Sequence, residues 1–470
     1  MDIGLSIISS YSLIIPTILQ INSIDFRFFL IYITKITMYK ELTMTIHVVT
    51  EGETLQSIAD QYGLSVEFIQ GQNELPNPDN LVVGQTIVIQ YPKTTYTVQE
   101  NDNLIDIADA NDTTVVNILR NNPSLNTRDF IYPGETLVID FEEEKLGSTN
   151  LNGYAYPFIN RRTLQKTLPY LTFLTIFTYG FTPEGALIPI DDSELISISR
   201  NYGVAPIMLL STLTPEGTFS NALAHSLLTN EEVQDTLIQN ILTNMRTKNY
   251  YGLDVDFEFI YPEDRDAYVD FINKLRVELN DNNFEVMVAL APKTSDDQPG
   301  TLYEGHDYAA LGAAANTVLL MTYEWGYAFG PPMAVSPINK VREVLDYAIT
   351  RIPPAKIYMG IPNYGYDWPL PFVRGTTEAT SIGNVAAVER AAQYGATIQY
   401  DETSQAPFFN YTNEEGVEHV VWFEDARSMD AKLRLIFEYG FRGGSYWNIM
   451  KFFPQNWLVA NSLYDINKVL

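Results

Sequence analysis

The sequence has 470 residues, 46% of them hydrophobic, so it is long enough for two or more domains with buried cores. Its formal net charge of −29 would repel phosphate backbones, which argues against nucleic acid as a partner, and no feature indicates a particular protein partner. The sequence contains no cysteine, which excludes disulfides, thiolate catalysis and cysteine-bound zinc. The histidines lack metal-ligand spacing, so neither a metal ion nor another cofactor is expected; they are His47, His225, His306 and His419.

The first 43 residues differ in composition from the rest of the chain. From Ile3 to Ile24 the segment carries no charge and is about long enough to span a bilayer. However, Pro16 interrupts it, and its flanks lack both the basic residues of a signal peptide and the charge bias that orients a membrane anchor. We therefore favour a translation start at Met44, with residues 1–43 as a mis-assigned extension, over a membrane anchor at residues 3–24.

Residues 45–91 and 94–141 form an internal repeat. The pattern of Val, Leu and Ile-Ala that begins at Val49 returns from Val98, and Gly84-Gln85-Thr86 returns as Gly134-Glu135-Thr136. Each copy predicts a short strand, two helices and a closing strand. This pattern resembles the LysM module, a βααβ unit that binds glycans containing N-acetylglucosamine. The second copy departs from the family by having Asn101-Asp102-Asn103 where a turn led by glycine is usual.

The LysM resemblance implies that glycan binds at the turn between the first strand and helix and at the loop before the last strand. Two such sites in tandem would give avidity on a polymer. Small polar residues in turns can also serve the turn alone, and that interpretation stays open. The residues concerned are Thr54, Asn80 and Leu81 in the first copy and Asn103 and Phe130 in the second.

After an acidic linker at residues 142–150, strand-like runs alternate with amphipathic helical stretches as far as the C-terminus. Eight such runs predict an α/β fold, a closed (β/α)8 TIM barrel over residues 151–470. The long gap between the seventh and eighth predicted strands indicates a small α+β insertion at about residues 366–422. The predicted strands cover residues 153–156, 173–177, 205–210, 253–259, 285–290, 317–322, 356–361 and 443–448.

Three carboxylates alternate with apolar residues in the fourth predicted strand. Strand geometry places Asp254, Asp256 and Glu258 on one face, while the apolar residues between them pack against helices on the other. Crowding and partial burial should raise at least one pKa and leave a protonated acid near neutral pH. The segment therefore predicts a site with a proton donor. A Ca²⁺ or Mg²⁺ site and a merely solvated strand face are the competing interpretations.

Active sites of barrels lie where the strands end, and three predicted strand ends carry candidate residues. Glu258 ends the fourth strand, Tyr323-Glu324 the sixth, and Trp447 the eighth. Together they resemble glycoside hydrolase family 18, whose fourth strand carries Asp-x-x-Asp-x-Asp-x-Glu and whose sixth carries Met-x-Tyr-Asp. Two positions depart from the family: Tyr251 replaces the outermost Asp, and Glu324 stands where Asp is common, which shifts the expected sugar contact by a methylene.

This resemblance implies a retaining, substrate-assisted mechanism in which the N-acetyl oxygen of the sugar attacks the anomeric carbon. Glu258 would protonate the leaving oxygen, Asp256 would orient the acetamide, and Asp254 would hold the proton balance beneath them. Tyr323 would hydrogen-bond the acetamide carbonyl, unless it is simply a core aromatic residue. The expected sugar-contacting residues are Trp447, as an apolar floor, together with Met321, Glu324 and Asn363.

Two LysM-like repeats ahead of such a barrel, with the segment at residues 360–368, resemble the spore-germination cortical-fragment hydrolases of endospore-forming bacteria. The resemblance implies N-acetylglucosaminidase action on spore cortex peptidoglycan or its fragments, and a location in the spore coat, cortex or cell wall. The alternatives are a chitinase or chitooligosaccharide hydrolase, and a glycan-binding barrel without activity. The acid at Glu258 argues against the last of these.

Overall fold

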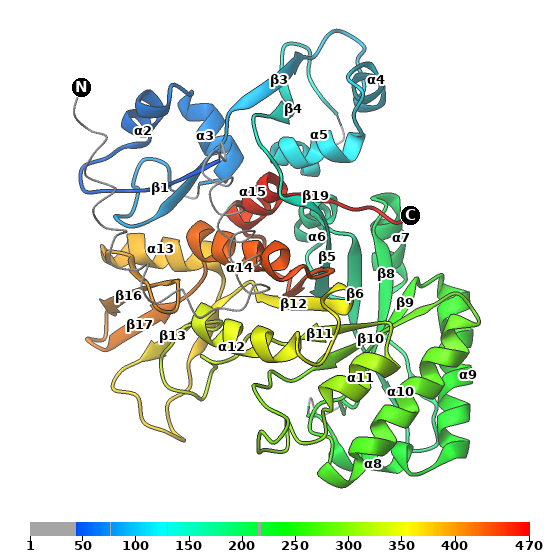
Figure 1. The fold of residues 1–470 in the computed structure, drawn as a ribbon. Coiled ribbons are helices and arrows are strands. Elements are labelled where there is room, and N and C mark those ends of the chain that lie inside the picture. The colour runs from blue at the N-terminus through cyan, green and yellow to red at the C-terminus, as the bar shows by residue number, and fades with distance from the viewer. Residues whose placement is uncertain (1–43, 76, 129, 215–217) are drawn as a thin grey trace, which may run out of the picture. The chain divides into compact units, whose positions relative to one another are not determined.

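The computed structural model describes residues 44–75, 77–128, 130–214 and 218–470 of the chain (Figure 1). The apolar segment at residues 3–24, interpreted from the sequence as part of a mis-assigned extension or as an anchor, lies outside these described residues. Within them, no helix combines the length and the apolar character that crossing a membrane requires.

Both repeats fold as the expected βααβ modules. The first strand of each pairs antiparallel with the last, and two helices lie between them in the chain. The first module consists of β1 (Thr45–Val48), α2 (Leu55–Tyr62), α3 (Val66–Asn73) and β2 (Thr86–Ile89). The second consists of β3 (Pro92–Thr97), α4 (Leu104–Ala110), α5 (Val115–Asn121), the 3₁₀ helix η4 (Pro123–Thr127) and β4 (Thr136–Phe141).

One asparagine at the same place in each module ties the second helix to the closing strand. The Nδ2 of Asn122 donates to the carbonyls of Ile118 at 2.8 Å and Val138 at 2.7 Å, and its Oδ1 accepts from the Val138 N–H at 2.8 Å. Asn73 makes the equivalent three hydrogen bonds in the first module. Both asparagines are buried, so they satisfy backbone groups that water cannot reach.

In the described part of the chain, eight parallel strands form the predicted TIM barrel. Each pairs with its neighbours in chain order, and the pairings of β5 with β6 and with β18 close the ring. The barrel strands are β5 (Gly147–Ala155), β6 (Phe173–Phe181), β8 (Ala205–Ser211), β9 (Gly252–Asp256), β10 (Glu285–Leu290), β11 (Thr317–Leu320), β12 (Ile357–Pro362) and β18 (Gly443–Trp447).

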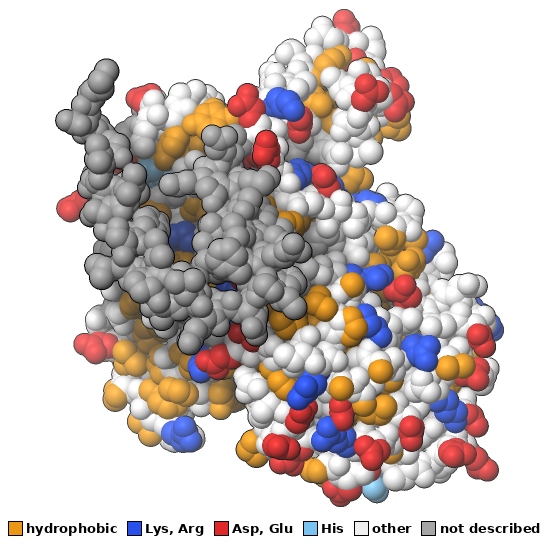
Figure 2. All heavy atoms as spheres, viewed as in Figure 1, with side chains coloured by type: hydrophobic (Ala, Val, Ile, Leu, Met, Phe, Trp, Pro, Cys, Tyr) orange, Lys and Arg blue, Asp and Glu red, His pale blue; other side chains and the backbone are white. Residues whose placement is uncertain are grey.

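Helices surround these strands, as Figure 1 shows most clearly for the segment from α8 to α12. On the face seen in Figure 2, acidic side chains alternate with Lys and Arg over this helical region. The barrel helices are α6 (Arg161–Thr167), α7 (Ser193–Asn201), α8 (Asn221–Leu228), α9 (Glu231–Lys248), α10 (Arg265–Asn280), α11 (Tyr308–Ala314), α12 (Ile338–Ala348), α14 (Ala426–Tyr439) and α15 (Pro454–Leu463).

Among the differences from the expected boundaries, three concern the linker and the candidate site. The linker predicted at residues 142–150 is shorter, because β5 already begins at Gly147, where it pairs with β19 (Tyr464–Ile466). The fourth and sixth strands end early, at Asp256 and Leu320. The chain then leaves the extended conformation, with a φ of 56° at Phe259 and 65° at Glu324. Consequently Glu258 and Tyr323 lie on the loops after the strands.

The expected α+β insertion between the seventh and eighth strands is present. It is an antiparallel sheet accompanied by helix α13 (Asn384–Tyr394), and the predicted hairpin pairs Phe408 with Trp422. The sheet order is β14 (Thr380–Ile382), β13 (Gly365–Pro369), β17 (Glu418–Trp422), β16 (Ala406–Thr412) and β15 (Gln399–Asp401).

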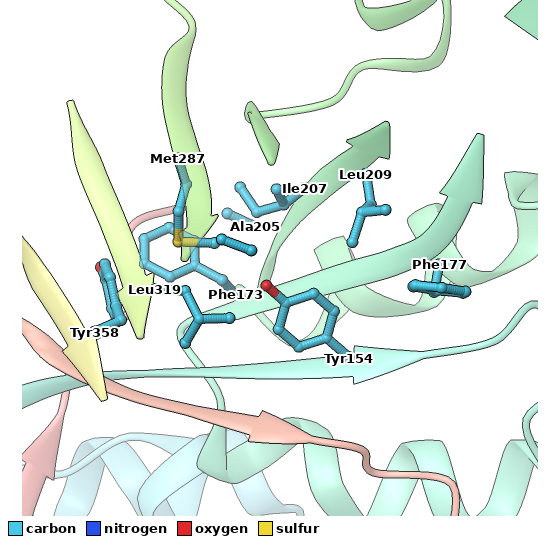
Figure 3. Close-up of a cluster of buried hydrophobic side chains, with 10 residues drawn as sticks. Tyr154, Phe173, Phe177, Ala205, Ile207, Leu209, Met287, Leu319 and Tyr358 are labelled. Carbon is cyan, nitrogen blue, oxygen red and sulfur yellow. The ribbon is translucent and has the colours of Figure 1, made fainter. Parts of the chain in front are cut away.

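Side chains fill the inside of the barrel. Figure 3 shows Phe173, Met287 and Tyr358 meeting there from different strands, within one buried cluster. Tyr251 packs against this cluster, with its ring centroid 5.7 Å from that of Phe173. Because it directly precedes β9, Tyr251 lies at the opposite end of that strand from Glu258, where it contributes to the core.

The asparagine link in the second module can be tested with Asn122→Ala. The change leaves the buried N–H of Val138 without its acceptor, so it should lower the free energy of unfolding of this module by about 1–3 kcal/mol. Hydrogen exchange at the Val138 amide, followed by mass spectrometry, should be faster in the variant. Glu100→Ala, at an exposed position of the same module, is the control. Unchanged exchange in Asn122→Ala would contradict the role assigned to the link.

Candidate active site

The carboxylates of residues 254, 256 and 258 gather at the C-terminal end of β9. The apolar residues between them are buried, and Phe257 stacks on Tyr268 and Phe271 of α10, with centroids 5.8 and 6.1 Å apart. This apolar side anchors the segment to the helical layer. The alternation therefore places the carboxylates toward the barrel interior, as the sequence predicts.

Asp254 forms the buried base of the site. It is fully buried, and its Oδ2 accepts a hydrogen bond from the hydroxyl of Tyr154 on β5. Burial raises the pKa of Asp254 to about 7, although the Tyr154 hydrogen bond acts in the opposite direction. Near neutral pH, Asp254 is therefore a mixture of the protonated and ionised forms. Sequence reasoning missed Tyr154, although it falls within the first predicted strand.

Asp256 lies between the other two acids and is buried. Burial raises its pKa well above the usual range, and the charges of Glu258 and Asp254 raise it further. Its Oδ1 has no hydrogen-bond partner among the described residues. The raised pKa favours the protonated form, and a protonated carboxyl can both donate to and accept from a polar group placed above it.

Glu258 is the outermost acid and is half-buried. Burial raises the pKa of Glu258 to about 7, and the charge of Glu324 acts in the same direction. A substantial fraction of Glu258 is therefore protonated at neutral pH while its side chain is still reached by solvent. These are the properties of a general acid.

Two tyrosines from the segment after β12 hold Glu324. The Tyr364 hydroxyl donates to Oε1, and the Tyr366 hydroxyl lies 3.1 and 3.3 Å from the two carboxylate oxygens. Burial raises the pKa of Glu324, while these two hydrogen bonds oppose the shift. Sequence reasoning named Glu324 as a sugar contact but missed both tyrosines. Their only signal is their spacing in Asn363-Tyr364-Gly365-Tyr366.

Tyr323 and Trp447 lie beside the carboxylates. Burial raises the pKa of Tyr323 well above 10, and the charge of Asp256 raises it further, so its hydroxyl stays protonated. The Trp447 ring packs against Tyr154 and Phe177, with centroids 5.6 and 5.1 Å apart, and belongs with Tyr323 to one apolar cluster. The structure thus brings together the residues predicted at the three strand ends.

Met321 and Asn363 have mainly structural contacts. Met321 packs against the apolar core of the barrel. The buried Nδ2 of Asn363 donates to the carbonyls of Asn448 at 3.1 Å and Lys451 at 2.8 Å. Its backbone N–H donates to the Trp447 carbonyl at 3.1 Å. Asn363 therefore positions the segment that carries Trp447, and its Oδ1 is the atom left for any sugar contact.

The residues predicted to bind glycan in the second LysM module line one groove. Asn103 caps α4 by accepting from the backbone of Ile105 and Asp106, and Phe130 lines the same groove with 60% of its surface exposed. The first module differs. Thr54 caps α2, Asn80 is exposed, and Leu81 packs half-buried against the core of its own module.

The competing metal interpretation receives no support from the geometry. Among the residues that the structure describes, no group of three or more His, Asp or Glu side chains could hold a metal ion. The three acids at residues 254, 256 and 258 are instead separated by depth in the barrel, from the fully buried Asp254 to the half-buried Glu258.

Comparison with known proteins finds two families in the sequence. The family described as "Glycosyl hydrolases family 18" matches residues 211–451, and the LysM domain matches residues 47–90 and 96–140. The cortical fragment-lytic enzyme of Bacillus subtilis (strain 168) is 41% identical over 431 residues, which cover 90% of this chain and 99% of the relative.

Solved structures give the same result. The spore cortex-lytic enzyme SleL of Bacillus megaterium QM B1551 has a TM-score of 0.77 and 39% identity, covering 91% of this chain and 100% of the other. The spore cortex-lytic enzyme SleL of Bacillus cereus also has a TM-score of 0.77, with 35% identity and coverage of 91% and 99%.

Replacing Asp254 with Asn should stabilise the protein more at about pH 8 than at about pH 5. Asp254 ionises near pH 7 when folded but near its ordinary value of 3.8 when unfolded. Between these values the folded state binds more protons, so stability falls as pH rises, by up to about 4 kcal/mol. Asn removes this loss. Thermal unfolding at the two pH values measures it, and a pH-independent difference would contradict the raised pKa.

Proposed function

This chain belongs to family 18 of the glycosyl hydrolases, and from that premise we propose that it cleaves N-acetylglucosamine linkages in spore cortex peptidoglycan or its fragments during germination. Its similarity to a cortical fragment-lytic enzyme over 90% of its length supports this substrate. The observation that carries the chemistry is Glu258, a half-buried acid with a pKa of about 7 on the loop directly after barrel strand β9.

Glu258 would protonate the glycosidic oxygen as the bond to the leaving sugar breaks. The two acids of β9 are poor candidates for an attacking carboxylate, because Asp254 is fully buried and the raised pKa of Asp256 disfavours the anionic form that attack requires. These properties support the substrate-assisted route, in which the acetamido oxygen of the sugar attacks the anomeric carbon.

Asp256 and Tyr323 would hold that acetamido group. The Tyr323 hydroxyl, which stays protonated, would donate to the acetamide carbonyl, and Asp256 would bond the acetamide N–H through an oxygen that has no other partner among the described residues. The Trp447 ring, fixed by Tyr154 and Phe177, would form the apolar floor beneath the sugar.

The charges of Glu258 and Asp256 would be coupled during the reaction. The charge of Glu258 raises the pKa of Asp256, so when Glu258 loses its proton, Asp256 holds its own more tightly. This lowers the cost of an anionic Glu258 in a half-buried place, and that anion would activate the water that completes hydrolysis.

The LysM modules support action at a peptidoglycan surface. Modules of this family ahead of the catalytic barrel would retain the enzyme on a polymer of N-acetylglucosamine-containing glycan, since binding at one point raises the effective concentration at another. We accordingly place the protein at the spore cortex or cell wall.

Glu258→Gln should lower kcat by about 10²–10⁴-fold with a small change in KM, because it removes the proton donor and keeps the shape of the side chain. Release of products from cortex muropeptides and from a chromogenic N-acetylglucosamine substrate measures the effect. Glu263→Gln, which changes an exposed acid on the short 3₁₀ helix Pro262–Asp264 that follows, is the matched control. Equal rates for Glu258→Gln and the unmodified protein would exclude the enzymatic role and leave a glycan-binding barrel.

A comparison of chitin oligomers with cortex fragments distinguishes the two substrate classes. The unmodified protein is assayed on both, with Glu258→Gln as the inactive control. We expect the unmodified protein to cleave cortex fragments faster, and mass spectrometry of the products identifies the bond that breaks. A preference for chitin would replace the peptidoglycan assignment with that of a chitinase.

The rate should fall as pH rises through about 7, since Glu258 acts as an acid only when protonated. Glu324→Gln removes a negative charge that raises the pKa of Glu258, so in this variant the fall should begin at a lower pH. The pH profile of kcat/KM for the two proteins tests this coupling. An unchanged alkaline limb would show that Glu324 does not influence the acid.

A further inference from the structure

The loop before β2 of the first LysM module is packed into the insertion of the barrel. Val82 is only 6% exposed and belongs to one apolar cluster with Ile398 and other insertion residues. The Ile398 N–H donates to the Val83 carbonyl at 2.9 Å, and Arg427 donates to the Gly84 carbonyl at 3.2 Å. This loop is one of the two segments from which LysM modules would contact glycan, and here the chain itself covers part of it.

A pair of equivalent glycines shows how close this contact is. A Cβ added at Gly84 would lie 1.9 Å from the carbonyl oxygen of Ile398, whereas one added at Gly134 of the second module would have nothing within 4 Å. The φ angles of the two glycines are 86° and 89°, so their backbone conformations are alike. The two glycines differ in their surroundings. The insertion lies against Gly84, whereas no other part of the described chain lies within 4 Å of a Cβ at Gly134.

The next residues of the first module bind the barrel itself. Thr86 donates through Oγ1 to Oε1 of Gln455 on α15 at 2.8 Å, and the Nε2 of Gln455 donates to the Thr86 carbonyl at 2.6 Å. Both side chains are buried. The first module therefore contacts the insertion and the barrel at once, through residues 82–86.

The second module leaves the corresponding residues exposed. Counting back from the two glycines, Tyr132 corresponds to Val82 and is 51% exposed, and Phe130 corresponds to Asn80. Counting forward from the helix caps Thr54 and Asn103, Ile105 of the second module corresponds to Gln56 of the first. Ile105 is 65% exposed. Large apolar side chains exposed in this way mark binding surfaces more often than they serve folding.

These apolar residues border a groove with polar walls. Phe130 and Tyr132 pack edge to face, with centroids 5.2 Å apart, and Asn103 and Arg128 line the same groove as Phe130 and Ile105. An apolar surface beside amide and guanidinium donors suits N-acetylglucosamine, whose ring face and acetamido methyl are apolar and whose hydroxyls accept hydrogen bonds.

We propose that the two LysM modules have different roles: the first is a structural clamp between the insertion and the barrel, and the second is the module that binds glycan. The choice of an N-acetylglucosamine-containing glycan as ligand rests on the proposed function. The division of roles rests on the contacts of residues 82–86 and on the exposure of residues 105, 130 and 132.

Binding to insoluble peptidoglycan tests the second half of this proposal. In a Glu258→Gln background, which prevents digestion, the double change Ile105→Ala and Phe130→Ala should weaken co-sedimentation by about tenfold or more. The equivalent double change in the first module, Gln56→Ala and Asn80→Ala, should leave it within about twofold. Equal weakening by the two pairs, or a larger effect of the first-module pair, would overturn the division of roles.

Thermal unfolding tests the clamp with the two glycines. Both changes to Ala impose the same backbone strain, but only Gly84→Ala also meets the Ile398 carbonyl, so its unfolding temperature should fall further than that of Gly134→Ala. If Gly84→Ala does not fold, Val82→Ala compared with Tyr132→Ala makes the same comparison through a buried and an exposed side chain. Equal shifts in the pair that is measured would overturn the clamp.

Hydrolysis of a soluble chromogenic substrate by the unmodified protein is measured separately. Its absence would count against the proposed function, while the sedimentation and unfolding comparisons would still decide between the two modules. The two conclusions can therefore fail independently.

Discussion

The removal of three neighbouring carboxylates from water is the constraint on which the site depends. Asp254, Asp256 and Glu258 share one face of a segment whose other face is anchored by buried apolar side chains. A charged carboxylate is costly to bury, and like charges nearby increase that cost, so the group retains protons that free carboxylates would have lost. The fold thereby keeps an acid available near neutral pH, and the depth of each residue in the barrel distinguishes the three.

The other residues of the site are far from these acids in the sequence, yet they contact them or change their pKa values. Tyr154 comes from the first barrel strand and bonds the deepest acid, while Tyr364 and Tyr366 come from the start of the insertion and hold Glu324. The insertion is therefore part of the electrostatic setting of Glu258, because Glu324 raises the pKa of that acid. Any element that steadies the insertion also bears on the site, and the first LysM module contacts the insertion directly.

The two modules also show how one sequence pattern can serve two purposes. Their first helix caps, their buried asparagines and the positive-φ glycines before their last strands are equivalent, in keeping with the repeat that the sequence predicts. Val82 and Tyr132 occupy equivalent positions, and both side chains are apolar. Sequence periodicity does not distinguish the one that is buried at a contact from the one that stays exposed. Only the presence of the insertion beside one module makes that distinction.

The sequence by itself determined the barrel, the insertion, the two βααβ modules and the acid cluster, since alternation, turn residues and repeat spacing arise between neighbours in the chain. Tertiary structure alone decided that the strands before Glu258 and Tyr323 end early, and that the amide of Asn363 bonds the segment after Trp447. It likewise decided that Tyr251 joins the core at the far end of β9. Desolvation, docking and hydrogen bonds between distant strands depend on residues that folding brings together. Local sequence patterns therefore cannot predict them.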